Sequence, residues 1–388
     1  MAAQRTYLDY NATAPMAPGV REAVCAAMEL MGNPSSVHQE GRAARALIEA
    51  AREQVAALAG APARRVIFTS GATEAANLAL TPHVGLPDRQ AIDILLVAAG
   101  EHPCVIDGHR FAPEAVHSVP LTAVGMLDLT ALERLLARMQ GKRCMLALQA
   151  ANNETGVVQP VKTAAALVHT HGGLVVCDAV QGVHRMDCSV LDADMIFFSA
   201  HKLGGPKGAG ALVLGNESIE INRPLLRGGG QERGARAGTE NVAAIAGFGA
   251  ASFLALTSRD AENIRQTGLR DRFENALLAR IPGVTLFGAH APRLANTSAF
   301  AIEKMSAETM LIGLDLEGVA VSSGSACSSG KVRTSHVLEA MGVAPDLSRC
   351  ALRISVGAGT QTEDIEFALA ALEKVAGRMT ALRIKTAA

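Results

Sequence analysis

The fold is decided by the stretch Met195-Ile196-Phe197-Phe198-Ser199-Ala200-His201-Lys202, which continues as Leu203-Gly204-Gly205-Pro206-Lys207-Gly208-Ala209-Gly210. Its first four residues are apolar and predict a buried strand. The glycines and the proline that follow predict a turn in which the backbone can approach a ligand closely. Lys202 therefore stands just beyond the carboxyl end of the strand. In a water-poor pocket its amine could form a Schiff base with a carbonyl group. A solvated lysine in a glycine-rich turn is the alternative interpretation.

Short apolar runs alternate with helical patterns on both sides of this stretch. Helices are expected at 18–31, 43–58, 75–80, 129–139 and 163–171, and strands at 65–70, 92–98, 144–150, 174–178, 194–199 and 211–214. This alternation predicts an α/β fold with a mainly parallel sheet. Ligands bind such sheets outside the carboxyl ends of the strands. We therefore expect three groups to meet at one edge, namely Ser70–Thr73, Asp178 and Ser199–Lys202.

The second half of the chain predicts a further, smaller unit. A glycine- and arginine-rich loop, 227–240, precedes a long helical region at 241–280 that we expect to bridge two domains. Strands at 298–302 and 352–356 and a closing helix at 363–382 follow.

Composition restricts the partners and the compartment. The chain has 388 residues, a net charge of −1, no Trp and only 3% aromatic residues. Nucleic acid and anionic membranes are therefore not expected as main partners. The seven cysteines contain no CxxC pair, which is typical of a reducing compartment, and no metal-ligand spacing occurs. The first residues lack the apolar core of a signal peptide, and the uncharged stretch 242–258 is expected to be a buried core helix. We expect a soluble, cytoplasmic protein.

Several polar residues at strand ends are candidates for chemistry, each with a structural alternative. Asp178 ends an apolar strand and needs a cation, such as a pyridinium nitrogen, or else a helix cap or an arginine pair. The Ser70-Gly71-Ala72-Thr73 turn offers backbone N–H groups and hydroxyls to an anion. His102 and Asn153 also follow strands, although a satisfied histidine and a plain turn would explain them equally well.

Two residues of the second half stand out for their surroundings. Cys327 lies in the small, polar run Ser322-Ser323-Gly324-Ser325-Ala326-Cys327-Ser328-Ser329-Gly330, which predicts an exposed, mobile loop and a reactive thiol. The other six cysteines lie mostly among apolar neighbours and are expected to be structural. Arg353 lies within an apolar strand and needs an anionic partner, either a substrate carboxylate or a structural acid.

The ordered set of these motifs resembles the cysteine desulfurases, the pyridoxal-phosphate enzymes of the NifS and IscS type, over nearly the whole chain. The motifs that carry the resemblance are Tyr7–Thr13, Gly32–Ser36, Phe68–Glu74, Glu101-His102, Ala151–Gly156, Asp178–Gln181, His201-Lys202, Arg236–Asn241 and Ser322–Cys327. The Asn-Asn-Glu-Thr-Gly run at 152–156 and Arg-Pro-Leu-Leu-Arg at 223–227 are more similar to the NifS branch.

The resemblance implies an aminotransferase-like fold of type I. A large domain, 16–250, would bind the cofactor, and a small α+β domain, 1–15 and 251–388, would carry the cysteine loop. The protein would be a homodimer with active sites at the interface. It would convert L-cysteine to L-alanine, take the sulfur as a persulfide on Cys327, and pass it to an iron–sulfur scaffold or another acceptor protein.

The resemblance also implies a role for each site residue. Lys202 would hold pyridoxal 5′-phosphate through a Schiff base, and His102 would stack on its ring and serve in proton transfer. Asp178 would pair with the ring nitrogen and Gln181 would bond the phenolic oxygen. The phosphate would be held by the turn Gly71, Ala72 and Thr73, by Ser199 and His201, and by Thr239 of the partner subunit. Asn153 and Arg353 would bind the substrate carboxylate.

Two departures from the family pattern lie near these residues. Lys331-Val332-Arg333-Thr334-Ser335-His336 replaces the usual segment after Cys327, and His184-Arg185 stands where the family often has Gly-Lys. A selenocysteine lyase and an aminotransferase on the same fold are the alternative functions.

Overall fold

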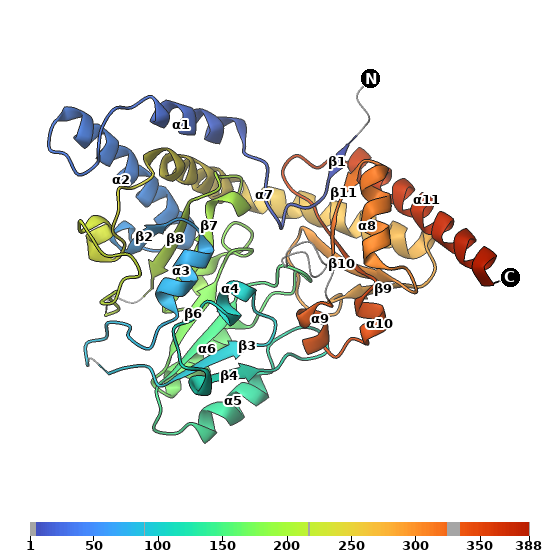
Figure 1. Cartoon of the computed structure of the whole chain (residues 1–388), viewed down its shortest axis with the longest axis horizontal. Helices are drawn as coiled ribbons and strands as arrows, with labels where there is room; N and C mark the ends of the chain where they lie inside the picture. Colours follow the sequence, from blue (N-terminus) through green and yellow to red (C-terminus); the bar gives the residue numbers. More distant parts are fainter. Residues whose placement is uncertain (1–4, 89, 216–217, 324–333, 388) are drawn as a thin grey trace.

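The computed structural model describes the backbone of residues 5–88, 90–215, 218–323 and 334–387, with side chains up to residue 381. Its main feature is a seven-stranded sheet with the order β2-β8-β7-β6-β5-β3-β4 (Figure 1). The strands are β2 Val66–Thr69, β8 Gly210–Leu214, β7 Met195–Ser199, β6 Leu174–Asp178, β5 Cys144–Gln149, β3 Ile94–Ala98 and β4 Val116–Val119.

The sheet is mainly parallel, as predicted. All pairs from β7 to β4 are parallel, and β8 is antiparallel to both of its neighbours. Because β2 and β7 both run against β8, β2 points the same way as β7. The carboxyl ends of β2, β6 and β7 therefore lie at one edge of the sheet.

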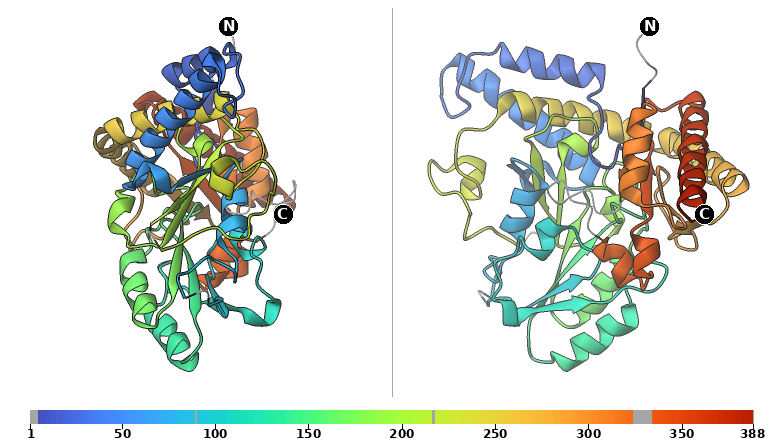
Figure 2. Two further views of the ribbon diagram at one scale, coloured as in Figure 1. Left: turned by 90° about the vertical axis from the view of Figure 1, so that its left-hand side faces the viewer. Right: turned by 45° about the vertical axis from the view of Figure 1, so that its right-hand side comes forward.

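Both faces of this sheet are covered, which explains why its central strands read as continuous apolar runs. Phe197 faces the side of α3 (Ala72–Ala79), whereas Phe198 faces α2 (Gln39–Ala59) and α7 (Val242–Arg280). Phe198 meets Phe248 of α7 edge-on, with ring centroids 5.6 Å apart. Figure 2 shows the sheet nearly edge-on in its left view, with α3 on one side and α6 (Val161–Thr170) on the other.

A second, four-stranded antiparallel sheet has the order β12-β13-β10-β9. Its strands are β12 Ser322–Ser323, β13 Ala351–Ser355, β10 Thr297–Ile302 and β9 Val284–Phe287. The start of the chain joins this region, because β1 (Thr6–Tyr7) pairs in parallel with β11 (Val319–Ala320). Helices α8 (Ala307–Leu316) and α11 (Thr362–Ala387) pack beside it (Figure 1), and the short helices α9 (His336–Ala340) and α10 (Pro345–Ser348) lie toward the large sheet. The proposed domain limits at 15 and 250 stay a prediction.

Helix α7 runs along both regions (Figure 1). Asn241 caps it by accepting a hydrogen bond from the N–H of Ala244 at 3.1 Å. Its first half packs on α1 (Pro18–Met28) and α2, and its second half contributes Phe273 to the core of the small sheet. By length and composition alone α7 could cross a membrane, and 39% of its most apolar window is buried. The prediction of a buried helix holds only in part, because Phe253 is 53% exposed.

Several predicted boundaries were wrong, each for a local reason. The first helix ends at Met28, and α2 begins already at Gln39, where Nδ1 of His38 caps it by accepting a hydrogen bond from the N–H of Gly41. Strands β4 and β9 were not predicted, because most of their side chains are only half-buried. Ser322 and Ser323 are buried in β12 rather than in an exposed loop, since backbone pairing with β13 does not depend on apolar side chains.

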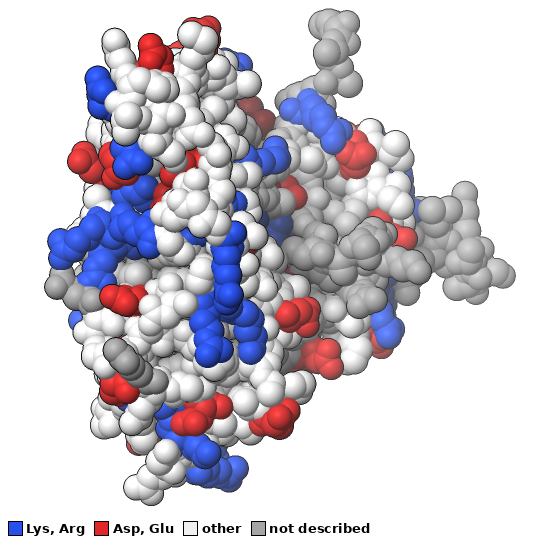
Figure 3. Space-filling model, turned by 60° about the vertical axis from the view of Figure 1, so that its left-hand side comes forward, with Lys and Arg blue, Asp and Glu red and all other residues white. Residues whose placement is uncertain are grey.

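Charge on the surface is mixed. On the face shown in Figure 3, Lys and Arg side chains lie in separate groups with acidic side chains between them. The exclusion of nucleic acid as a partner stays a prediction.

Candidate active site

A cavity of 650 Å³ lies at the edge of the large sheet where the carboxyl ends of β2, β6 and β7 meet. The groups expected at those ends, Ser70–Thr73, Asp178 and Ser199–Lys202, all contribute to its lining. Arg353 of the small sheet and the lead-in segment 11–13 close the opposite side. A cavity of this size, bounded by a few polar groups, accommodates a cofactor together with a small substrate.

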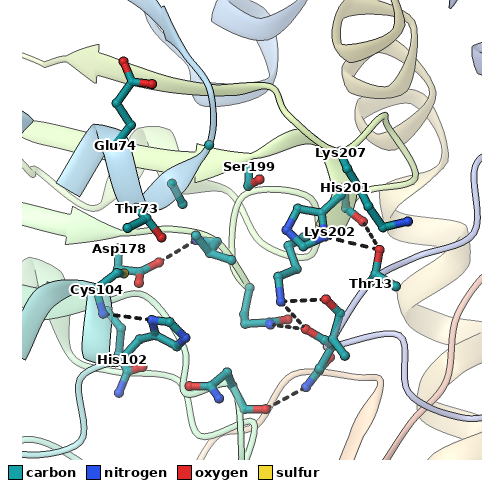
Figure 4. Close-up of a pocket in the computed structure, with 18 of the residues that line it drawn as sticks. Thr13, Thr73, Glu74, His102, Cys104, Asp178, Ser199, His201, Lys202 and Lys207 are labelled. Carbon is teal, nitrogen blue, oxygen red and sulfur yellow. Dashed lines mark hydrogen bonds between the residues drawn. The ribbon is translucent and has the colours of Figure 1, made fainter. Parts of the chain in front are cut away.

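Lys202 enters this cavity from the short 3-10 helix Ala200–Lys202 that follows β7. Its Nζ donates hydrogen bonds to the carbonyl oxygens of Asn11 at 2.6 Å and Ala12 at 2.9 Å, drawn as dashed lines in Figure 4. The lysine is therefore held in the cavity by the lead-in segment. This geometry favours the nucleophile over the solvated surface lysine.

Asp178 lies across the cavity from Lys202 (Figure 4) at the end of β6. It is 7% exposed, and its Oδ1 accepts a hydrogen bond from the N–H of Val180 at 2.9 Å. Burial raises its pKa to about 6, while the nearby charge of Lys202 acts in the opposite direction. Among the described residues no ion pair joins it to an arginine, so the arginine alternative is wrong. Asp178 is therefore a buried acid that faces the cavity and accepts one local hydrogen bond from the backbone of the following turn.

His102 is the cap of α4 (Pro103–Ile106), and its Nδ1 accepts a hydrogen bond from the N–H of Cys104 at 3.1 Å. An acceptor at Nδ1 places the ring proton of the neutral form on Nε2. Burial lowers the pKa of His102 to about 4, helped by the charges of Lys202 and His336. The ring is therefore neutral near pH 7, with a proton to hold or donate at Nε2.

The part of the cavity beside α3 is suited to an anion. Helix α3 begins at Ala72 without a side-chain cap at Gly71, so its amino end faces the cavity with its partial positive charge. Thr73 lies on its first turn, and Ser199 lies between Thr73 and His201, which is beside Lys202 (Figure 4). A side chain in place of Gly210 would lie 2.6 Å from the backbone of Gly71, so the start of β8 must be glycine for this turn to close. These donors match a phosphate group.

Arg353 has the structural acid of its two predicted alternatives, and its binding of a substrate carboxylate stays a prediction. It is 4% exposed, and it pairs with Asp9 through Nη2 at 2.5 Å and donates to the carbonyl oxygen of Asn153 through Nη1 at 2.9 Å. Its Nε is buried and has no partner in the described part of the chain. The ion pair is structural, and the N–H at Nε is available to a carboxylate.

Three further predicted residues behave differently. Gln181 lines the cavity and donates from Nε2 to the carbonyl oxygen of Asn11 at 3.0 Å. Thr239 is exposed and does not line the cavity of its own chain. Cys327 lies outside the described residues.

Sequence reasoning missed part of the lining. Asn11 and Thr13 were seen only as members of a motif, and Thr13 forms a hydrogen bond with His201 between Oγ1 and Nδ1 at 3.2 Å. Cys104 was expected to be structural, yet it lines the cavity, where burial raises the pKa of its thiol. Cys25 is exposed, which also contradicts the expectation for the remaining cysteines. No alternation or spacing signal points to a single thiol of this kind.

Comparison with known proteins shows the family to which the chain belongs. The class V aminotransferase family model matches residues 6–367. The chain belongs to this family. It is 40% identical over 387 residues to a cysteine desulfurase of Enterobacter agglomerans, covering 98% of this chain and 94% of the relative. It is 37% identical over 378 residues to cysteine desulfurase IscS of Dictyoglomus turgidum, covering 96% and 94%. The structure of a NifS-like protein from Rickettsia africae superposes with a TM-score of 0.86 at 33% identity, covering 96% of this chain and all of the other.

Class V aminotransferases use pyridoxal 5′-phosphate, and the residues present in this chain fit it. Asp178, a buried carboxylate that forms no ion pair among the described residues, suits a pyridinium nitrogen. Neutral His102 suits stacking on a ring, Lys202 can supply the Schiff base, and the amino end of α3 suits the phosphate. The cysteine-desulfurase resemblance and the type I aminotransferase fold are confirmed, whereas the role of each residue stays a prediction.

Proposed function

We propose that this class V aminotransferase is a cysteine desulfurase that converts L-cysteine to L-alanine and transfers the sulfur to Cys327. One observation carries the proposal together with the family. A single cavity holds a lysine, a buried aspartate that forms no ion pair among the described residues, and a buried arginine whose Nε–H has no partner there. The first two suit the cofactor and the third suits the carboxylate of an amino acid.

When bound, pyridoxal 5′-phosphate supplies an electron sink for breaking bonds at the α-carbon of the substrate. The chain's own residues orient it. Lys202 would anchor it covalently, Asp178 would keep its ring nitrogen protonated, and His102 would cover the ring. Gly71, Ala72 and Thr73 at the start of α3, with Ser199 and His201, would hold the phosphate.

The substrate carboxylate is bound at the other side of the cavity. Arg353 is fixed by Asp9 and by the carbonyl oxygen of Asn153, so the unpartnered N–H at Nε belongs to a guanidinium that is held in place. The Asn153 side chain is half-buried and lines the same wall. Lys202 and the neutral His102 are then the groups that can move protons, at Nζ and Nε2 respectively.

The sulfur step balances without an external oxidant. The Cys327 thiolate attacks the sulfur of the bound cysteine, the carbon–sulfur bond breaks, and a sulfur–sulfur bond forms on Cys327. The bonding electrons stay with the carbon, which is protonated to give alanine. The small, polar sequence around Cys327 and the similarity to cysteine desulfurases support this role for Cys327.

The test is incubation of the purified protein with L-cysteine and a reductant, with alanine and sulfide measured. Borohydride should trap the cofactor on Lys202. Cys327→Ala should abolish sulfide release, whereas Cys25→Ala, which removes an exposed thiol, should leave it unchanged. Full turnover in Cys327→Ala would sink the proposal.

We further propose a cytoplasmic homodimer that supplies sulfur to an iron–sulfur scaffold or another acceptor protein. The six cysteines in the described ranges are all free thiols, which suits a reducing compartment. Thr239 is exposed, and Leu225 and Leu226 nearby are 38% and 45% exposed, which suits a surface covered by a second copy. Light scattering after gel filtration tests the dimer, and weaker cofactor binding in Thr239→Ala tests the contribution across it.

A further inference from the structure

A second, smaller cavity lies on the other side of Lys202. It has a volume of 160 Å³, and Lys202 lines both cavities. Its remaining polar lining includes Tyr10, His184, Arg185, Arg259 and Glu262. The proposed function gives this cavity no task. It contains the pair His184-Arg185 that departs from the family pattern.

Arg185 is a buried cation without an acid beside it. Its side chain is 7% exposed, and no ion pair joins it to an Asp or Glu among the described residues. Burial lowers its pKa to about 9, and the charge of Arg353 adds to this effect. A buried guanidinium without a carboxylate is unfavourable for stability. A contribution to stability therefore does not explain this residue.

The hydrogen bonds of Arg185 lead to a single residue of the main cavity. Nη1 donates to the side-chain Oε1 of Gln181 at 2.7 Å and to the backbone oxygen of the same residue at 3.1 Å. The amide of Gln181 is thus bound at one end by Arg185. Its Nε2 donates to the carbonyl oxygen of Asn11 at 3.0 Å, which also accepts from Nζ of Lys202 at 2.6 Å.

The neighbours of Gln181 permit only one orientation of its amide. Arginine has donors only, so Oε1 must face Arg185. The carbonyl oxygen of Asn11 is an acceptor only, so Nε2 must face Asn11 and Lys202. One N–H of Nε2 remains for an acceptor in the main cavity, and a reversed amide would present a lone pair there instead.

We propose that Arg185 is a positioning residue that locks the amide of Gln181 with its N–H toward the cofactor's phenolic oxygen. This inference rests on the proposed function, because it requires the cofactor to lie beside Lys202. The fixed N–H stabilises the anionic form of that oxygen. Loss of Arg185 therefore makes the proton shared with the lysine nitrogen harder to remove.

The other charged groups of the small cavity are bound elsewhere. Arg259 donates to the carbonyl oxygen of Met186 at 3.3 Å, and Glu262 pairs with Arg265 at 2.8 Å. Nδ1 of His184 is buried without a partner in the described part of the chain, and its pKa is lowered well below the usual value by burial and by Arg185, so the ring is neutral. Arg259 is thus a matched control, since it adds charge to the same cavity and makes no bond to Gln181.

The experiment is a pH titration of the absorbance of the bound cofactor in the holoenzyme, which reports the proton at the lysine nitrogen. Arg185→Met should raise the midpoint by about one pH unit, the size of shift that one hydrogen bond to a charged atom produces. Arg185→Lys, which keeps a donor, should restore most of the difference. Arg259→Met should leave the midpoint unchanged.

A double-mutant cycle with Gln181→Ala decides whether Arg185 acts through Gln181. The single variant Gln181→Ala should also raise the midpoint, and adding Arg185→Met to it should add little. A full additional shift in the double variant would overturn the inference. An unchanged midpoint in Gln181→Ala alone would also overturn it, and this measurement can be made even if Arg185→Met does not fold. If the wild-type protein binds no cofactor or releases no alanine from cysteine, the proposed function fails instead.

Discussion

The two sides of the main cavity use charge in opposite ways. On the side of the large sheet, Asp178 is buried and His102 is half-buried, and ionisation of both is disfavoured, so the pKa of the acid is raised and that of the base is lowered. On the side of the small sheet and the lead-in segment, Arg353 is paired with Asp9, and Lys202 is held by two backbone carbonyl oxygens.

From this contrast we expect Asp178 to be stabilised only when a ligand binds, and the Asp9–Arg353 pair to stabilise the fold without a ligand. An unpaired buried charge costs stability until a ligand of opposite charge arrives. A buried pair costs stability only when one partner is removed. Substitutions on the two sides should therefore change the stability of the cofactor-free protein in opposite directions.

The largest effect is expected at the residue that both sides share. Lys202→Ala should lower alanine formation at least about 10³-fold, because covalent anchoring and a proton-transfer group are lost together. Borohydride should no longer fix the cofactor to the protein. Lys142→Ala, an exposed lysine before β5, should retain full activity. Substantial turnover without Lys202 would remove the central residue of the proposed mechanism.

The paired side should lose stability when one partner is removed. Asp9→Asn leaves the guanidinium of Arg353 buried without its acid, and the free energy of unfolding should fall by about 3–5 kcal/mol. Urea unfolding of the cofactor-free protein measures this. A change below about 1 kcal/mol would place the Asp9–Arg353 pair among the weak surface pairs.

The ligand side should gain stability by the same kind of substitution. The pKa of Asp178 is about 6 in the folded protein and 3.8 for an unperturbed aspartate, as in the unfolded chain. The folded state therefore binds more protons than the unfolded state between these pH values. Stability therefore falls as pH rises through this window. Asp178→Asn should make the cofactor-free protein more stable by about 2–3 kcal/mol at pH 7.5, with the difference vanishing below about pH 4.

The holoenzyme provides the control for this prediction. With cofactor bound, the order should reverse, since Asp178→Asn removes the partner of the ring nitrogen. Thermal unfolding with and without cofactor separates the two cases. A less stable cofactor-free variant at pH 7.5 would show that Asp178 supports the fold and is not held for a ligand.

The smallest effect is expected outside the cavity. Arg5 and Asp315 form an ion pair at 2.6 Å with side chains 59% and 63% exposed. Asp315→Asn should change the free energy of unfolding by less than about 1 kcal/mol, and high salt should remove even that. A loss as large as that of Asp9→Asn would mean that burial is not what distinguishes the two pairs.

The sequence predicted the ligand side of the cavity far better than the paired side. Asp178 and Lys202 end or follow apolar strands, so a parallel sheet necessarily brings them to one edge. Asp9 and Asn11 reach the cavity by contacts across the chain: the carbonyl of Asn11 meets a lysine 191 positions away. No periodicity or spacing encodes such a contact, and only the family motif drew attention to the segment.

Arg185 shows the same limit at a shorter range. It was noticed because it departs from the family pattern, but its bond to Gln181 depends on how the turn after β6 closes. Thr239 is a different case, because it is predicted to contact the phosphate bound in the partner subunit. Two residues of β12, Ser322 and Ser323, were misjudged because pairing of the main chain leaves no trace in side-chain polarity.

The acceptor shared by Lys202 and Gln181 is a main-chain oxygen, and this has a genetic consequence. No codon change at position 11 can delete that oxygen, because every amino acid carries it. What a codon change can alter is its position, since the Asn11 side chain donates to Thr297 at 2.9 Å and accepts from Asn296 at 2.9 Å. A mutational scan should therefore detect the hydrogen bond of the Lys202 amine only indirectly, through substitutions of the polar residues that fix the backbone around Asn11.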